Sequence, residues 1–185
     1  MRRACDEHDA TAAATGAGTA ATLGAVRIEI SEAPWEDPVG VRLRRDQERE
    51  TVERYGGDLE QGEKPSAATT AVFLLATEAA SGEVVGCGGL RRLDGDTFEL
   101  KRMYVVPAWR GHRIGQTLLH ALEEAGRDRG AVRMRLETGW EQPEAMRLYE
   151  RCGYHRIPLY GPYVGCAASV CFERSLRREP APADA

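Results

Sequence analysis

Two arginines and two glycines lie close together between two apolar segments, as Arg110, Gly111, Arg113 and Gly115. Glycine lets a ligand approach the backbone because it has no Cβ, and arginine supplies a fixed positive charge. Apolar residues then recur at spacings of three and four, which predicts a helix from Ile114. The first N–H groups of a helix lack intrahelical partners and carry partial positive charge. The pattern therefore predicts a site for phosphate or pyrophosphate.

Two common phosphate-binding patterns do not fit this turn. It contains neither G-x-G-x-x-G nor the lysine of G-x-x-x-x-G-K-[ST]. The turn instead resembles motif A of the GNAT superfamily, the acyl-CoA N-acyltransferases. That motif has Arg or Gln, two residues, Gly, one residue, and Gly or Ala, after a strand ending in V-x-P. Val-Val-Pro at 105–107, Arg110 and Gly115 carry the resemblance, and Arg113 departs from it because the family has Gly there.

A second segment, QPEAMRLYERCGY at 142–154, resembles the family's other signature, N-x-x-A-x-x-L-Y-x-x-x-G-F. Gln142 replaces Asn and Tyr154 replaces Phe, whereas the Leu-Tyr pair at 148–149 matches. The two segments occur in the family's order, with the strand-like VRMRLET between them. The resemblance covers about residues 69–172.

The conformation at Arg113 decides how the turn works. If the turn opens a regular helix, Arg113 is right-handed helical and its N–H joins the phosphate cradle. If its φ must be positive, an arginine is costly there. On the helical interpretation, Arg113→Gly loosens the start of the helix by ~1 kcal/mol. It then raises the KM for acetyl-CoA more than it lowers kcat, because phosphate contacts are made equally in the ground and transition states.

Length and composition limit the class of protein. With 185 residues, 42% of them hydrophobic, the chain predicts one domain at 25–178, with disordered segments at 1–24 and 179–185. A net charge of −4 argues against a nucleic-acid partner held by a broad basic surface. The apolar runs are too short to span a membrane, and acidic residues at 6–9 interrupt any signal-peptide core. We expect a cytoplasmic protein with neither nucleic acid nor membrane as partner.

The cysteines predict neither a disulfide framework nor a metal site. Their number is odd and no C-x-x-C occurs. No histidine stands at motif spacing from Cys152 or Cys171, so a covalent cysteine mechanism is disfavoured. The five cysteines are Cys5, Cys87, Cys152, Cys166 and Cys171.

Hydrophobic periodicity predicts an α/β (α+β) fold with a mixed, mostly antiparallel central sheet and helices on both faces. We interpret the charged residues of the first helix as a solvated face, although the family uses this region to wall the acceptor site. The resemblance further implies a sheet that splays between its fourth and fifth strands, where CoA enters. The predicted strands are 26–30, 69–77, 83–90, 98–106, 132–138, 154–159 and 169–174, and the predicted helices are 39–55, 114 to a cap at 129–130, and 143–152.

Transfer of an acetyl group from acetyl-CoA to an amine needs a proton acceptor for the amine and a proton donor for the leaving thiolate. The resemblance makes Glu99 the candidate general base, directly or through water, with an ordinary exposed strand carboxylate as the alternative. It makes Tyr149 the candidate general acid, with a core aromatic as the alternative.

The candidate binding residues fall into two sets. An exposed loop position is the alternative for His112, and packing is the alternative for Tyr160 and Tyr163. Lys101 and Arg102 oppose the acidic residues, so the charge preference of the acceptor pocket stays open. The acceptor set is Glu99, Glu137, Tyr160 and Tyr163. The acetyl-CoA set is Met103, Tyr104, Val105, Arg110, Gly111, His112, Arg113, Ile114, Gly115, Gln116, Gln142 and Tyr149.

Three functions compete at this point. The first is an acetyl-CoA-dependent N-acetyltransferase acting on an amine of a small molecule or a protein. The second is a CoA-binding regulatory domain without catalysis. This alternative stays open because Arg113 and Gln142 depart from the family's motifs. The third is a nucleotide-binding protein that uses the same turn. A homodimer through the C-terminal strands is common in families of this kind.

Overall fold

The structure is a computed structural model, and it describes residues 26–57 and 61–177. The segments expected to be disordered, 1–24 and 179–185, lie outside the described residues. Within the two described ranges, no helix combines the length and the apolar character that crossing a bilayer requires.

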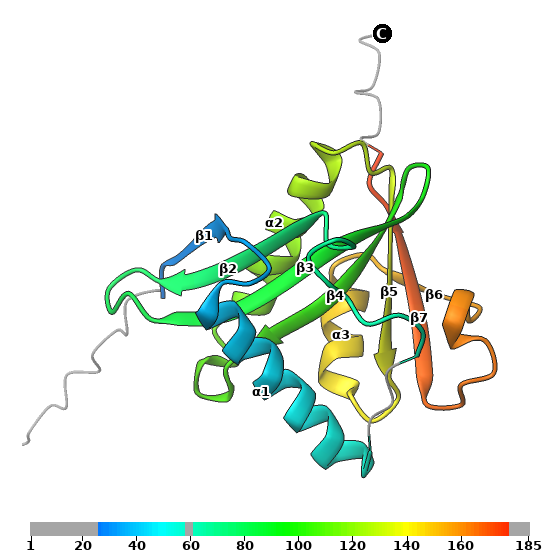
Figure 1. The fold of residues 1–185 in the computed structure, drawn as a ribbon, viewed down its shortest axis with the longest axis horizontal. Helices are drawn as coiled ribbons and strands as arrows, with labels where there is room; N and C mark the ends of the chain where they lie inside the picture. The colour runs from blue at the N-terminus through cyan, green and yellow to red at the C-terminus, as the bar shows by residue number, and fades with distance from the viewer. Residues whose placement is uncertain (1–25, 58–60, 178–185) are drawn as a thin grey trace, which may run out of the picture.

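Seven strands form one sheet in the order β1-β2-β3-β4-β5-β7-β6 (Figure 1). Only β4 and β5 pair in parallel, and the other neighbours are antiparallel. The predicted mixed, mostly antiparallel sheet is therefore confirmed. The strands are β1 (Ile28–Glu32), β2 (Val72–Glu78), β3 (Val84–Asp94), β4 (Thr97–Val105), β5 (Arg133–Gly139), β6 (His155–Ile157) and β7 (Ser169–Ser175).

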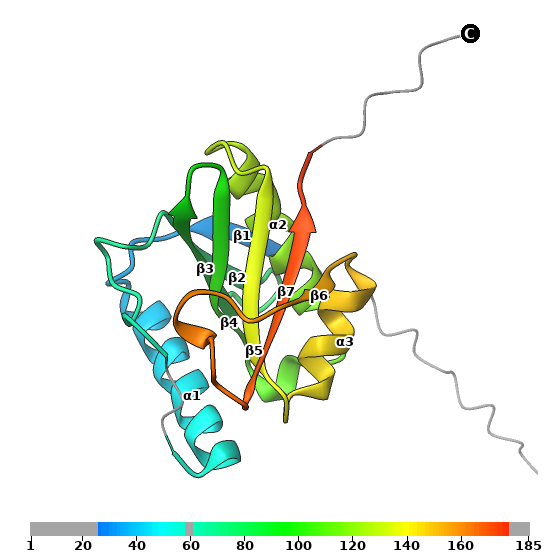
Figure 2. The same ribbon diagram turned by 90° about the vertical axis from the view of Figure 1, so that its right-hand side faces the viewer.

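Helices cover both faces of the sheet, as predicted. Helix α1 (Pro38–Tyr55) lies on one face, and α2 (Ile114–Arg127) and α3 (Pro143–Arg151) lie on the other (Figures 1 and 2). The core beneath α2 contains its fully buried leucines 118, 119 and 122. Two short 3-10 segments, η1 (Pro107–Trp109) and η2 (Gly161–Tyr163), complete the fold.

Local sequence sets both ends of α1. The carboxylate of Asp37 accepts hydrogen bonds from the N–H groups of Val39 and Gly40, each at 2.9 Å, and Pro38 occupies the first turn. Gly56 ends the helix in the left-handed conformation, with φ +72°.

Several predicted boundaries are wrong by one to four residues, with the largest difference at the end of β3, which is Asp94 and not residue 90. The strand predicted at 154–159 is only the three residues of β6, and β1 begins two residues later than predicted. Helix α2 ends at Arg127, because Gly130, with φ +87°, belongs to the turn that follows the helix. Alternating apolar residues show where a strand lies but not where its hydrogen bonding stops.

The sheet opens between β4 and β5. Their pairing runs from Thr97↔Arg133 to Leu100↔Leu136, although β4 continues to Val105. Beyond Leu100, no strand among residues 26–57 and 61–177 pairs with the edge of β4 that faces β5. The splay implied by the family resemblance is therefore present, and it leaves main-chain groups of β4 available to a ligand.

A bulge in β4 changes which side chains face this opening. Arg102 has φ +57°, and the β3–β4 register slips so that two residues of β4 oppose Gly88. Successive strand residues normally face opposite sides of a sheet, and a bulge breaks this alternation. Leu100 and Met103 both pack into the core beneath α2. Lys101 and Arg102 both line a cavity on the side of α1.

Candidate active site

The larger of two adjoining cavities has a volume of about 360 Å³. It lies between α1, the open end of β4, the turn before α2, and α3. Eleven of the twelve predicted acetyl-CoA residues line it, and His112 does not. His112 is exposed, with Nδ1 3.3 Å from the carbonyl oxygen of Trp109, as its alternative interpretation held.

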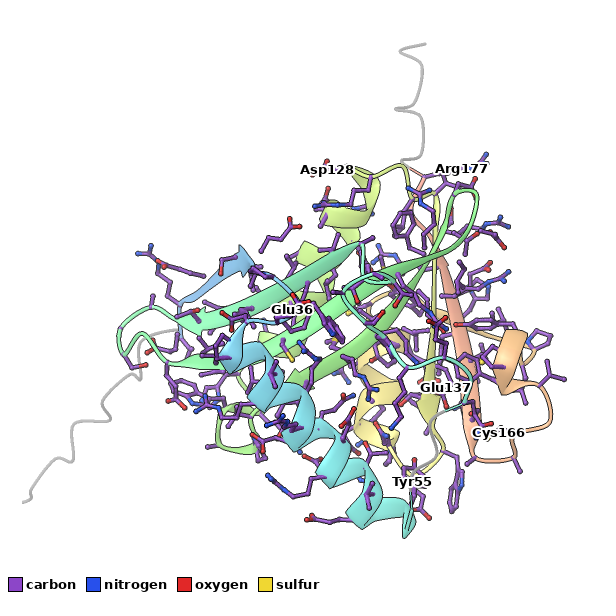
Figure 3. All side chains as sticks on the ribbon, in the orientation of Figure 1. Glu36, Tyr55, Asp128, Glu137, Cys166 and Arg177 are labelled. Carbon is purple, nitrogen blue, oxygen red and sulfur yellow. The ribbon has the colours of Figure 1, made fainter. Side chains whose placement is uncertain are left out.

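The smaller cavity, of about 130 Å³, lies under the C-terminal part of α1. Glu137 and Tyr163, two of the four residues of the acceptor set, line it, whereas Glu99 and Tyr160 do not. Tyr55 and Glu137, both in its wall, lie at the same end of the molecule (Figure 3). Five residues line both cavities and mark their junction: Gln47, Thr51, Met103, Gln142 and Tyr149.

Arg113 is left-handed, so of the two conformations that the sequence left open the one with positive φ is present. It is the N-cap of α2, with φ +61° and ψ +11°, and Gly111 nearby has φ +87°. The N–H of Thr117 donates to the carbonyl oxygen of Arg113 at 3.0 Å, so the helical hydrogen bonds begin here. The N–H groups before Thr117 belong to the first turn, which has no intrahelical acceptors to offer them. The glycine that the family has at this position adopts this conformation readily, whereas an arginine adopts it at a cost in conformational energy.

Because Arg113 is left-handed, Arg113→Gly should stabilise the protein by about 1 kcal/mol, the ordinary cost of this conformation for a residue with Cβ. Thermal denaturation should show a Tm about 2–4 °C higher. Arg113→Ala is the matched control, since it removes the same charge but keeps Cβ, and it should show no such gain. If both variants change Tm equally, the backbone at this position is not strained.

Arg110 is exposed and is also held by protein partners. Its Nη1 and Nη2 atoms donate to the Glu50 carboxylate at 3.0 and 2.6 Å, and its Nε donates to the carbonyl oxygen of Val105 at 3.0 Å. A phosphate at Arg110 would have to compete with Glu50. The predicted fixed positive charge of Arg110 is therefore paired with Glu50, and Arg110 links α1 to the open end of β4.

One face of α1 lines both cavities. Gln47, Glu50, Thr51 and Arg54 recur at spacings of three and four, and all line the larger cavity. Arg54 also bonds to Glu144 of α3 at 2.6 Å. The interpretation of this charged helix as a solvated face is therefore wrong for these residues. Their polar stripe was a signal in the sequence that helical spacing alone could have revealed.

Tyr149 lies where the two cavities meet. Its side chain is buried, with ring centroids 5.9 Å from Tyr154 and 6.0 Å from Phe172. Burial, and then the nearby Glu137 carboxylate, raise the pKa of the Tyr149 hydroxyl above its usual range. The hydroxyl therefore stays protonated at neutral pH and can act as a proton donor at the junction.

Glu99 is fully buried, so the alternative of an exposed strand carboxylate is wrong. Its Oε1 accepts hydrogen bonds from the hydroxyls of Tyr160 and Tyr163, both at 2.8 Å, and its Oε2 accepts one from Nε of Arg91. Burial, and then Glu99, raise the pKa of both tyrosine hydroxyls. Glu99 reaches the smaller cavity only through Tyr163, which is part of the cavity wall.

The smaller cavity has a mixed charge. Lys101 and Arg102 contribute two cations, and of the described residues in its wall only Glu137 carries a carboxylate. Nζ of Lys101 donates to the Tyr163 hydroxyl at 3.0 Å. The Ser169 hydroxyl donates to the Glu137 carboxylate at 2.6 Å. The charges of Lys101, Arg102 and Glu137 are evident in the sequence, but their position in the wall of one cavity is not.

The four described cysteines line neither cavity. Burial raises the pKa of the Cys87 thiol to about 12 and that of Cys171 to about 11. Such thiols are protonated at neutral pH and are poor nucleophiles. Across 26–57 and 61–177, no group of three or more His, Cys, Asp or Glu side chains is placed to hold a metal ion.

Comparison with known proteins agrees with this geometry. The acetyltransferase (GNAT) family profile matches residues 29–154. IAA acetyltransferase of Azospirillum brasilense is 36% identical over 135 residues, which are 69% of this chain and 87% of the relative.

Two solved structures extend the comparison. A Klebsiella pneumoniae protein described as an acyl-CoA N-acyltransferase has a TM-score of 0.70 at 31% identity, over 81% of this chain and 98% of that one. A GNAT family acetyltransferase from Elizabethkingia anophelis, solved with acetyl-CoA bound, has a TM-score of 0.59 at 18% identity, over 80% and 97% of the two chains. The match to the family profile covers more than half of the sequence. The chain therefore belongs to the acetyltransferase (GNAT) family and is an N-acetyltransferase enzyme.

Proposed function

We propose that this enzyme transfers an acetyl group from acetyl-CoA to a primary amine by direct attack of the amine on the thioester. The observation that carries the proposal is the junction of the two cavities at Tyr149, beside the open end of β4. The larger cavity takes acetyl-CoA and the smaller one takes the amine. The acetyl-CoA bound to the Elizabethkingia anophelis relative supports the choice of cosubstrate.

Acetyl-CoA is held mainly by the backbone. Its pyrophosphate lies against the turn from Gly111 to Gln116, where the N–H groups at the start of α2 meet the positive end of the helix dipole. The pantetheine arm runs along Met103, Tyr104 and Val105, on the edge of β4 that β5 leaves unpaired. Main-chain N–H groups on this edge stabilise the oxyanion that forms when the amine attacks.

The amine loses a proton toward Glu99 through Tyr163. As the amine nitrogen bonds to the thioester carbon, its proton passes to the Tyr163 hydroxyl oxygen, and the Tyr163 proton passes to Oε1 of Glu99. The bond of 2.8 Å between Tyr163 and Glu99 provides this route. Glu99 therefore acts at a distance, rather than by touching the amine.

Tyr149 completes the reaction at the other side of the junction. When the tetrahedral intermediate collapses, the carbon–sulfur bond breaks and the thiolate of CoA takes the Tyr149 proton. The raised pKa of this hydroxyl keeps the proton in place until the thiolate forms. Solvent then returns a proton to Tyr149 and removes one from Glu99, which restores the starting state.

Release of free CoA tests the proposal. The full-length protein is mixed with acetyl-CoA and a panel of small amines, and a thiol reagent monitors the reaction. Turnover that depends on the amine, with acetylated amine identified by mass spectrometry, supports an N-acetyltransferase. Tight CoA binding by calorimetry without turnover on any amine would indicate a CoA-binding regulatory domain. Binding of ATP or NAD that CoA does not displace would indicate a nucleotide-binding protein.

A further inference from the structure

The charged wall of the smaller cavity carries information about the acceptor that the family assignment does not. The bulge at Arg102 sends Lys101 and Arg102 to the same side of β4, and both line this cavity. An unbulged strand would have pointed one of the two toward the opposite face. Two cations in the wall would not favour the binding of an acceptor whose only charge is a positive one.

The position of Lys101 beside Tyr163 is the informative detail. Nζ of Lys101 lies 3.0 Å from the Tyr163 hydroxyl, the group through which the amine is proposed to lose its proton. An anionic group bound by Lys101 would therefore lie next to the reacting nitrogen. A carboxylate on the carbon that carries the amine has this spacing, because one carbon separates the two groups.

The other groups in the wall agree with such an acceptor. Arg102 adds a second cation and is held in place by Glu48 of α1 at 3.1 Å. The Glu137 carboxylate lies close enough to both Tyr149 and Tyr163 to raise the pKa of each hydroxyl. The cavity wall thus carries charges of both signs, with Lys101 as the cation in contact with Tyr163.

The volume of the smaller cavity limits the size of the acceptor. Its volume of about 130 Å³ is small beside the roughly 300–1,000 Å³ of typical ligand pockets. A protein segment or a long polyamine would have to extend out of it. We infer that the acceptor is a small α-amino acid, whose carboxylate is bound by Lys101 and whose amine is placed between Tyr163 and the thioester.

This inference rests on the proposed acetyltransferase function and narrows its acceptor. The test compares three amino acids with the amines that lack only the carboxylate: alanine with ethylamine, serine with ethanolamine, and methionine with 3-(methylthio)propylamine. We expect kcat/KM to be about 10- to 100-fold higher for each amino acid, the usual effect of one hydrogen bond between charged groups. Alanine should also exceed β-alanine, because its carboxylate is nearer the nitrogen.

Lys101→Met should remove this preference by raising KM for the amino acids much more than for the amines, while any change in kcat that comes from the lost contact with Tyr163 should affect both classes equally. Lys64→Met is the matched control, since Lys64 is the only other lysine of the chain, is exposed and lines neither cavity. Lys101→Arg should restore most of the preference.

Amines that react as well as the amino acids would overturn the inference while leaving the acetyltransferase function intact, and so would a preference that survives Lys101→Met. The wild-type comparison decides the question even if Lys101→Met does not fold. Absence of turnover with every compound would overturn the proposed function, and the inference with it.

Discussion

Tyr149→Phe should lower kcat by about 100-fold or more, with the dissociation constant of CoA nearly unchanged. The substitution removes only the hydroxyl, so the ring keeps its contacts with Tyr154 and Phe172. A general acid typically contributes about 10²–10⁴-fold, and without it the thiolate must take a proton from water. Steady-state kinetics with acetyl-CoA, together with calorimetric titration of CoA, separate the loss of rate from the loss of binding.

Tyr154→Phe is the matched control for this experiment. Tyr154 is also buried and its ring packs against Tyr149, but it lines neither cavity. Its loss should leave kcat within about 3-fold of wild type. If Tyr149→Phe retains full activity, or if the two variants lose equal activity, Tyr149 is a core aromatic and the proton comes from another group.

Tyr163→Phe and Tyr160→Phe should differ in rate although each removes one hydrogen bond to Oε1 of Glu99. Tyr163→Phe also removes the acceptor of the Lys101 hydrogen bond. Both hydroxyls donate to Oε1 of Glu99 at 2.8 Å, so each loss should cost about 1–3 kcal/mol of folding free energy. Only Tyr163 lines the smaller cavity. We therefore expect kcat to fall by about 100-fold in Tyr163→Phe and by less than about 3-fold in Tyr160→Phe.

Urea denaturation and steady-state kinetics on the same preparations make this comparison quantitative. If the two variants lose similar stability but unequal kcat, Tyr163 carries the proton in addition to its hydrogen bond to Glu99. Equal losses of kcat would mean that both tyrosines act only by holding Glu99. Glu99→Gln should lose rate in either case, so it cannot replace this pair of variants.

The lining of the larger cavity was largely predictable from sequence because most of it comes from local segments. A strand, a turn with Gly111 and Gly115, and the start of a helix form one continuous segment, and their residue types determine the geometry. Tyr149 followed from a second continuous segment. The sequence did not predict the backbone conformation of Arg102 and Arg113, because arginine is not a residue type that indicates positive φ.

The smaller cavity and the surroundings of Glu99 were less predictable because they are assembled from distant parts of the chain. Glu99 is buried by Arg91 and by two tyrosines more than 60 residues away, so strand periodicity alone could not show its partners. The bulge that turns Lys101 toward the cavity depends on the register between β3 and β4. Pairing register is a tertiary property, and residue spacing within one strand does not determine it.

A crystal structure with CoA bound tests the central claim most directly. The account predicts the pyrophosphate against the N–H groups from Gly111 to Gln116 and the pantetheine along the open edge of β4. It predicts the sulfur atom at the junction, within hydrogen-bonding distance of the Tyr149 hydroxyl and facing the cavity that contains Lys101. CoA bound outside the larger cavity, or with its sulfur directed away from Tyr149, would contradict the account.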